Sequence, residues 1–275
     1  MPPARLPILA IAVCVLLIVA ALLGGVLAPY AADEADFGAV MVPPYGLEGG
    51  TVAHLLGTDQ LGRDMLSRLI AGTRISMLTA GAAVLVAGTI GVLLGLIAGY
   101  LGGLVDAAIM RLVDAFLALP FILMALALVA ALGTGVGNII LVMILTNWAR
   151  YARLVRSEVL SIKRRDFVLL ARVAGVRPLT IAMRHVLPNA QTSILVLAVL
   201  DVGRAIILES SLSFLGLGIQ PPDMSWGLIL AQGRTYMGIA WWLTVWPGLA
   251  IVLAVVCFNT VGERLRVKFD PRGAL

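Results

Sequence analysis

The sequence predicts an all-α fold, a polytopic membrane bundle with six transmembrane helices. Hydrophobic residues make up 61% of the 275 residues and charged residues only 13%, whereas a soluble domain is about 45–50% apolar. Apolar runs near the length that crosses a bilayer recur along the chain. Basic residues gather between alternate runs, which is the pattern of a chain threaded through a membrane.

Six spans are expected, at residues 6–28, 75–101, 112–132, 136–148, 192–208 and 239–261. The first, second and sixth contain no charged residue. The third carries Asp114 and Pro120, and we expect a kink at Pro120 because proline removes a backbone hydrogen bond. The fifth is interrupted by Asp201 and Arg204.

The fourth span is short, with only 13 residues, and crosses only if Arg150 and Arg153 extend toward the membrane surface. Charge placement supports it. With six spans and the N-terminus inside, 15 basic residues lie in cytoplasmic segments and 4 in outside segments. Both termini are therefore expected in the cytoplasm. This orientation also explains the net charge of +5 without a nucleic-acid partner.

Three regions follow from the spans: a transmembrane anchor at 1–29, an extracytoplasmic loop at 30–74, and a five-helix core at 75–275 that includes the basic loop 150–189. The apolar core of the anchor is longer than that of a signal peptide, and its exit "LAPYAA" is a poor cleavage site. We expect the anchor to be retained.

Glycines in the second span recur at nearly helical spacing, at Gly88, Gly91, Gly95 and Gly99. Together they predict a helix face that another helix can approach closely. Incidental small residues, which are common in membrane helices, are the alternative.

Charged residues inside spans are the candidates for a function within the membrane. Asp201 and Arg204 share one helix face, and each is costly if it faces lipid. They form either a polar patch on a translocation path or an ion pair that makes the helix tolerable. Arg111 and Asp114 have the same spacing near a membrane edge, where an ion pair is expected.

Signs of catalysis are missing from the sequence. No G-x-x-x-x-G-K-[ST] loop occurs, and no trio of nucleophile, base and orienting residue is evident. The two histidines are isolated and both cysteines lie in apolar runs. We expect no catalytic residue, no metal site and no bound cofactor, so an enzyme is not expected.

The basic block "RRDFVLLARVAGVRPLTIAMRHVLPN" (164–189) predicts a helical hairpin on the cytoplasmic side. Gly175 would end the first helix, and Pro178 would begin a second that stops before Pro188. Ala171, Ala174 and Gly175 would form a small-residue face that fits a groove on a partner. A basic loop lying on anionic membrane lipid is the alternative.

This block resembles the cytoplasmic EAA loop of ABC-importer permeases, E-A-A-x-x-x-G followed by nine residues and H-x-L-P. The matching residues are Ala171, Gly175, His185, Leu187, Pro188 and Asn189, while Leu169 and Leu170 replace the first two letters. The resemblance implies a coupling helix that docks in a cleft of the ATPase subunit. Its expected coupling residues are Leu169, Leu170, Ala171, Arg172, Gly175, His185 and Pro188. Without the glutamate, any ion pair that it makes with the ATPase is in doubt.

A second segment, "LLGTDQLGRDMLSRLIAGTRIS" (55–76), predicts a short amphipathic helix lying flat at the outer interface. Thr58 or Asp59 would cap it, and Asp64 would pair with Arg68. Without a family resemblance, the segment would be only an amphipathic lead-in to the second span. It resembles the G-T-D-x-x-G-R-D-x-x-S-R signature of C-type permeases in dipeptide, oligopeptide and nickel importers. The signature residues here are Gly57, Thr58, Asp59, Gly62, Arg63, Asp64, Ser67 and Arg68.

The resemblance continues through "MRLVDAFLALP" (110–120), "SFLGLGIQPPDMSWG" (213–227), "WPGLAI" (246–251) and "FNTVGERLRVKFDPR" (258–272), and so covers about residue 45 to the end. It implies a type I ABC-importer permease in the bacterial plasma membrane. The implied partners are a related B-type permease in a heterodimer, two P-loop ATPases that bind the ATP, and an extracytoplasmic binding protein. The loop around Gly216, Gly218, Pro221 and Pro222 would then form a cap or docking surface on the outer side.

The expected function is import of di- or oligopeptides by alternating access. Nickel is the alternative substrate within the family, and peptides are favoured because the chain offers no histidine or cysteine cluster. A secondary transporter or a membrane scaffold protein are the alternatives from other classes. No internal repeat supports the former, and the latter would not need charges within a span.

Overall fold

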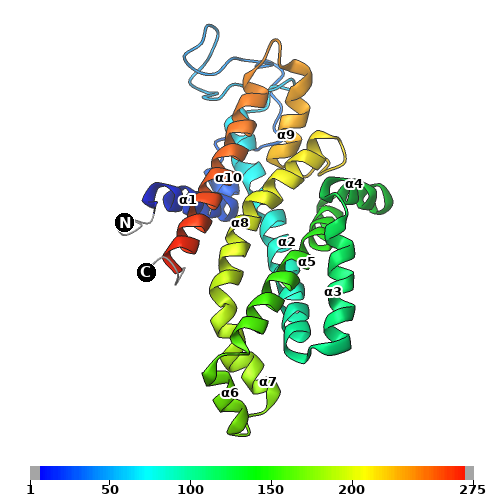
Figure 1. Ribbon diagram of the computed structural model, residues 1–275. Helices are drawn as coiled ribbons and strands as arrows, with labels where there is room; N and C mark the ends of the chain where they lie inside the picture. Colours follow the sequence, from blue (N-terminus) through cyan, green and yellow to red (C-terminus); the bar gives the residue numbers. More distant parts are fainter. Residues whose placement is uncertain (1–6, 270–275) are drawn as a thin grey trace.

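The computed structural model describes residues 7–269, which form a bundle of helices (Figure 1). Within this range the only β-type pairing is an isolated bridge between Thr58 and Asp64, and the predicted all-α class is confirmed. Leu6, the expected start of the first span, and Arg5 and Arg272 lie outside the described residues. In chain order the elements are α1 (Ile8–Leu27), α2 (Met65–Leu101), α3 (Gly103–Ala118), α4 (Phe121–Leu132), α5 (Val136–Ile162), α6 (Asp166–Val173), α7 (Pro178–Ile181), the π-helix η1 (Ala182–Val186), α8 (Leu187–Phe214), α9 (Trp226–Gly233), the 3₁₀ turn η2 (Arg234–Tyr236) and α10 (Trp242–Phe269).

The bundle is elongated, with different structures at its two ends (Figure 1). Helices α6 and α7 project from one end, here named the hairpin end. The segment 28–64 and α9 lie at the other, here named the loop end. Helix α1 packs beside α2 and α10. Helices α2, α5 and α8 run along the long axis of the bundle and pack against one another.

Four helical segments are long and apolar enough to cross a membrane: Ile8–Leu27, Met65–Leu101, Pro178–Phe214 and Trp242–Phe269. A fifth is formed if α3 and α4 count as one span, although they meet at 93°. The expected kink at Pro120 is therefore a complete break. Leu119 adopts an extended conformation (ψ 135°) because the residue before a proline avoids the helical region.

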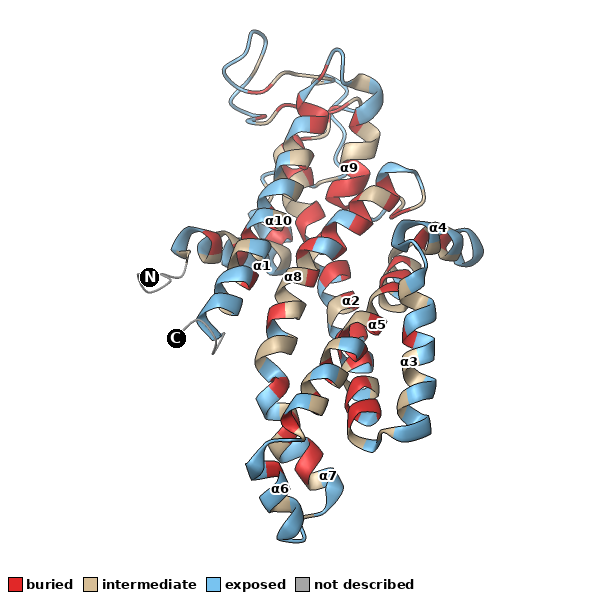
Figure 2. Ribbon diagram, viewed as in Figure 1, coloured by how far each residue is buried: buried red, intermediate tan, exposed pale blue. Residues whose placement is uncertain are grey.

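The expected count of six spans is not confirmed, because α5 is not apolar enough to count as a membrane-crossing helix. Its 27 residues are long enough, but Arg150, Arg153 and Arg156 occupy its second half. Helix α5 nevertheless packs against α2, α3, α4 and α8, and Figure 2 shows buried residues on it as on α2, α8 and α9. A membrane helix that packs against several others can carry charged residues where they face protein and have partners.

Several helices extend beyond the expected spans. Helix α2 begins at Met65 instead of residue 75, α3 at Gly103 instead of 112, and α8 continues to Phe214 instead of ending at 208. The expected boundary at 74/75 thus falls inside a helix. The spans predicted from hydropathy stop at polar or charged residues, but in the fold such residues in the added turns have protein partners. Asp106, for example, accepts two hydrogen bonds from Arg156.

The predicted glycine face is confirmed, and it contacts α5. A Cβ atom at Gly99 would lie 2.8 Å from the Cβ of Val159, and one at Gly95 would lie 2.9 Å from the Cβ of Val155. At Gly91 a Cβ would overlap the carbonyl oxygen of Trp148. Only residues without a side chain allow the two backbones to approach this closely.

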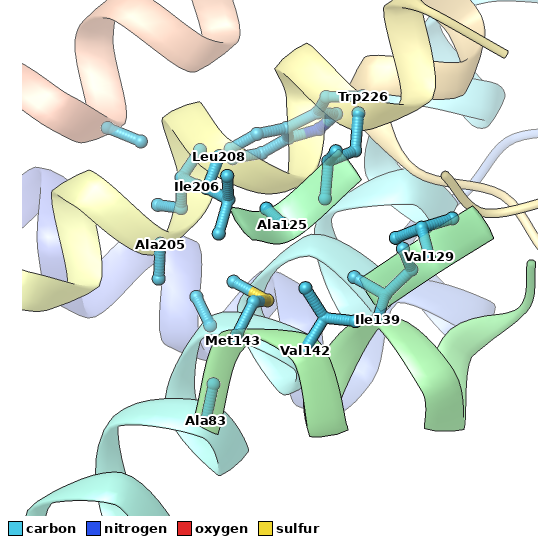
Figure 3. Packing of buried hydrophobic residues seen from close by; sticks show 13 residues of the cluster. Ala83, Ala125, Val129, Ile139, Val142, Met143, Ala205, Ile206, Leu208 and Trp226 are labelled. Carbon is cyan, nitrogen blue, oxygen red and sulfur yellow. The ribbon is translucent and has the colours of Figure 1, made fainter. Parts of the chain in front are cut away.

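One hydrophobic cluster joins six helices, α2, α4, α5, α8, α9 and α10, in the loop-end half of the bundle (Figure 3). It holds α4, which follows the bend after α3, against α5 and α8, and it includes Trp226 of α9. The indole Nε1 of Trp226 donates to the Leu69 carbonyl oxygen at 3.0 Å. The labelled members are Ala83, Ala125, Val129, Ile139, Val142, Met143, Ala205, Ile206, Leu208 and Trp226.

Candidate functional site

The basic block folds as a helical hairpin at the hairpin end (Figure 1). After α6 the chain reverses at Gly175, whose φ of +76° suits glycine. The amide of Val176 donates to the Ala171 carbonyl oxygen at 3.1 Å. Pro178 occupies the first turn of α7, as predicted, because its missing N–H is not needed there.

The hairpin is anchored on one side and exposed on the other. Val168 and Ile181 are buried in a cluster that also contains Val159 of α5. On the opposite side Leu170, Val173 and Leu179 are 68%, 86% and 74% exposed. Exposed apolar side chains on a projecting hairpin form a candidate interaction surface. We name Leu170, Val173 and Leu179 the exposed hairpin face.

The expected small-residue face is wrong in detail. Ala171 packs against the buried cluster, whereas Ala174 and Gly175 are exposed. The helix therefore turns its larger apolar residues outward and Ala171 toward its own bundle. Arg172 is exposed, Leu169 is 43% exposed, and His185 is half-buried.

The second helix of the hairpin does not stop before Pro188, contrary to expectation. It continues through η1 into α8, so that Pro178–Phe214 is one helical segment. Proline cannot donate to the carbonyl four residues earlier, and a π-turn relieves this conflict without ending the helix. Asn189 Nδ2 donates to the His185 carbonyl oxygen at 2.6 Å beside Pro188. The hairpin is therefore joined to α8 without a loop.

Three arginines on successive turns of α5 pair with acids on neighbouring helices. Arg150 and Arg153, which were expected to extend toward the membrane surface, both have acidic partners on other helices. Asp114 also pairs differently from the expected partner Arg111. The pairs are Arg150 Nη1 with Asp201 Oδ1 of α8 at 3.1 Å, Arg153 with Asp114 of α3, and Arg156 Nη2 with Asp106 Oδ2 of α3 at 2.6 Å.

Asp201 and Arg204 lie halfway along α8 and form an ion pair at 3.6 Å. The Asp201 side chain is only 2% exposed, whereas those of Arg204 and Arg150 are 57% and 27% exposed. Both arginines line a cavity of about 400 Å³ between the α3–α4 bend, α5 and α8. The two arginines therefore shield Asp201 from solvent, while Arg204 itself still faces the cavity.

The signature segment at the loop end is a buried polar network, and the expected interfacial helix is absent. Asp64 caps α2 directly, accepting from the Ser67 amide at 2.8 Å. Residues 65–74 are the first turns of that long helix. The charged side chains Asp59, Asp64 and Arg68 of this segment instead have partners inside the protein.

Asp59 is the centre of this network. Its Oδ2 lies 2.7 Å from Arg63 Nε and 3.0 Å from Arg68 Nη1. Arg68, which is only 2% exposed, also donates to Gln232 Oε1 of the α9 helix at 2.7 Å. The expected pair between Asp64 and Arg68 is therefore wrong, because Arg68 reaches Asp59 across the loop.

The remaining signature residues hold the loop against the bundle. Asp64 Oδ1 lies 3.1 Å from His54 Nδ1, and Trp242 Nε1 of α10 donates to the Thr58 carbonyl oxygen at 3.0 Å. Gly57 and Gly62 both have positive φ, and a Cβ at Gly62 would overlap the backbone of Asp36. The signature thus specifies a folded cap on the loop end.

Glu209 was not predicted as a residue inside the membrane bundle, because the expected fifth span ends at residue 208. Its carboxylate is fully buried and accepts from Ser213 and Ser225, each at 2.7 Å. Ser225 in turn caps α9. An acid followed by hydroxyls in "ESSLS" (209–213) was the available signal for a hydroxyl-lined site inside the bundle.

A bundle of membrane-length helices with a projecting hairpin and a charged cavity between its helices is the architecture of a transport permease. The chain belongs to the family described as binding-protein-dependent transport system inner membrane component, whose model matches residues 91–274. It is a C-type permease of the peptide/nickel ABC-importer family. It is thus a multi-pass inner-membrane protein whose family works with ATPases and binding proteins.

Curated relatives from the same family differ in their substrates. The di/tripeptide transport system permease protein DppC of Pseudomonas aeruginosa is 42% identical over 257 residues, covering 94% of this chain and 85% of that protein. The glutathione transport system permease protein GsiD of Pectobacterium atrosepticum is 44% identical, covering 82% and 75%. The nickel transport system permease protein NikC of Escherichia coli K12 is 42% identical, covering 79% of each chain.

The fold is similar to that of a chain in an inward-facing structure of the MetNI methionine ABC transporter. The TM-score is 0.55 with 20% sequence identity, and the match covers 74% of this chain and 97% of that chain. At this identity the likeness establishes the type I importer fold alone.

Proposed function

We propose that this chain moves di- or oligopeptides from an extracytoplasmic binding protein into the cytoplasm by alternating access. The observation that carries the proposal is the exposed hairpin face, which places Leu170, Val173 and Leu179 at the tip of the bundle. Such a face needs a partner. The family to which the chain belongs supplies one, because its members work with ATPase subunits.

The proposed complex contains this chain, a B-type permease, two P-loop ATPases and the binding protein. ATP binds to the ATPases, and this chain supplies the path and the coupling hairpin. The hairpin and both termini lie in the cytoplasm, and the segment 30–74 lies outside. In this orientation α5 is the fourth of six spans and is enclosed by its neighbours.

The contacts of the hairpin suggest how its movement reaches the path. Val168 and Ile181 pack against α5, and η1 continues into α8. A shift of the hairpin therefore moves α5 and α8, the two helices that carry Arg150 and Asp201. Rigid-body movement of such packed elements is a common way to switch a transporter between states.

The proposed coupling residues divide into two groups. Leu169, Leu170, Arg172 and Gly175 would contact the ATPase cleft, together with Val173. Ala171, His185 and Pro188 would act indirectly, because they determine how the hairpin packs and how it joins α8.

A charge on the exposed hairpin face is expected to separate the ATPases from the permease. Val173→Glu should reduce co-purification of the ATPases by about tenfold or more, because an unpaired carboxylate would be buried in the docking site. Leu104→Glu is the control, since Leu104 is equally exposed but lies on α3. Equal ATPase recovery with both variants would contradict a docking role for the hairpin.

The orientation is tested with a cysteine at Ala174, which is exposed in the hairpin turn. A thiol reagent that does not cross membranes should label it in inverted vesicles and not in intact cells. Val52→Cys at the loop end should show the reverse. The native Cys14 and Cys257 are buried and give the background. Labelling of Ala174→Cys in intact cells would exclude the proposed topology.

Nickel remains the second candidate substrate, because a nickel permease is among the relatives with 42% identity. Within residues 7–269 no group of three or more His, Cys, Asp or Glu side chains could hold a metal ion. The reconstituted importer should therefore take up a radiolabelled dipeptide in an ATP-dependent manner. Uptake of radiolabelled nickel without peptide uptake would reverse the choice of substrate.

A further inference from the structure

The charged cavity on α8 has an unbalanced lining. Arg150 and Arg204 both face it, and none of its lining residues, all within the described range, is acidic. Asp201 lies behind the arginines and is not part of the lining. The cavity wall therefore carries positive charge where open space of about 400 Å³ is available.

The balance of charges around Asp201 explains why this positive charge is left over. One carboxylate serves two guanidinium groups, Arg150 at 3.1 Å and Arg204 at 3.6 Å. Further toward the hairpin end, Arg153 and Arg156 each have an acid of their own. The cluster at Asp201 thus has a formal charge of about +1, and Arg204 is its more exposed member.

The remainder of the lining is suited to an amphipathic ligand. Phe116, Phe121 and Met124 from the α3–α4 bend form an apolar wall, while Asn147 and Ser211 add polar groups. A small organic anion with an apolar body could place its charge on the arginines and its body on this wall. A hydrated metal cation would be repelled by the same charges.

We propose that this cavity binds the terminal carboxylate of a peptide in transit. Arg204 contacts the carboxylate of the peptide. Arg150 lines the same cavity and is held in place by its ion pair with Asp201. Guanidinium groups recognise carboxylates through paired, charge-assisted hydrogen bonds. This inference rests on the proposed function, and it adds a site and a chemical requirement, namely a free carboxylate.

The test uses the whole importer in nanodiscs, without nucleotide or binding protein, and radiolabelled alanyl-phenylalanine as the probe. Arg204→Gln should weaken binding by about tenfold to hundredfold, the loss expected for a charged hydrogen bond. Arg204→Lys, which keeps the positive charge but not the paired hydrogen bonds, should recover only part of the affinity. Arg266→Gln is the matched control, because Arg266 also pairs at i,i+3 and 3.6 Å with an acid, Glu263, but is remote from the cavity. It should bind like the unmodified importer.

Competition distinguishes the carboxylate from other ligand groups. Unlabelled alanyl-phenylalanine should displace the probe, whereas the same dipeptide with a C-terminal amide and nickel chloride should not. Displacement by the amide at equal concentration, unchanged binding in Arg204→Gln, or no saturable binding by the unmodified importer would each overturn the proposal.

A separate uptake assay with the binding protein tests the proposed function by itself. If the unmodified importer transports no peptide, the proposed function fails. If it transports peptide while Arg204→Gln and Arg266→Gln transport equally well, only the carboxylate site is rejected.

Discussion

Asp59→Asn is expected to destabilise the permease by about 3–5 kcal/mol, the cost of breaking a buried ion pair by removing one partner. The substitution preserves the shape of the side chain but removes its charge. Arg68, only 2% exposed, would then have only neutral partners for its buried charge. The thermal midpoint of the purified complex measures the effect.

Two further variants show that the buried charge is the cause. Adding Arg68→Met to Asp59→Asn should recover part of the loss, because no uncompensated guanidinium remains there. Glu263→Gln breaks an exposed pair and should cost no more than about 1 kcal/mol. An equal fall in thermal midpoint for Asp59→Asn and Glu263→Gln would contradict the role of the network.

Gly91→Ala is expected to separate α2 from α5 and to cost about 1–3 kcal/mol or more, as overpacking of a tight interface does. The new Cβ would overlap the carbonyl oxygen of Trp148 and the Cβ of Tyr151. The backbone cannot move aside locally, because Gly95 and Gly99 make the same close contacts one and two turns further on. Cellular abundance and the thermal midpoint should both fall.

Gly81→Ala is the control in the same helix, since nothing lies within 4 Å of a Cβ built there. It should be neutral or stabilise by up to about 1 kcal/mol, the difference in helix propensity between glycine and alanine. If both alanine variants behave alike, the glycine face is incidental and does not determine packing.

Local features of the fold could be predicted because they depend on neighbours in the chain. Apolar runs located α1, α2, α8 and α10, although some of their ends lie up to ten residues from the expected bounds, and Gly175 and Pro178 located the turn of the hairpin. Glycine spacing on α2 predicted the close approach of another helix, although it did not identify α5.

Other features were mispredicted where a side chain finds its partner far along the chain. Arg150 was expected at the membrane surface, but it meets Asp201 across a helix interface. Arg68 was assigned to Asp64 by helical spacing, but its partner is Asp59 in the preceding loop. Pro188 was read as a helix end, yet a π-turn carries the helix through it.

The sequence alone was sufficient for the membrane-helical class, the hairpin and the family resemblance, because hydropathy, turn residues and motifs are properties of contiguous residues. Only the tertiary structure decided which charges are neutralised and which remain free. Ion pairing depends on distances between separate helices, so the positive charge at Arg204 could be recognised only once α5 had placed Arg150 against Asp201.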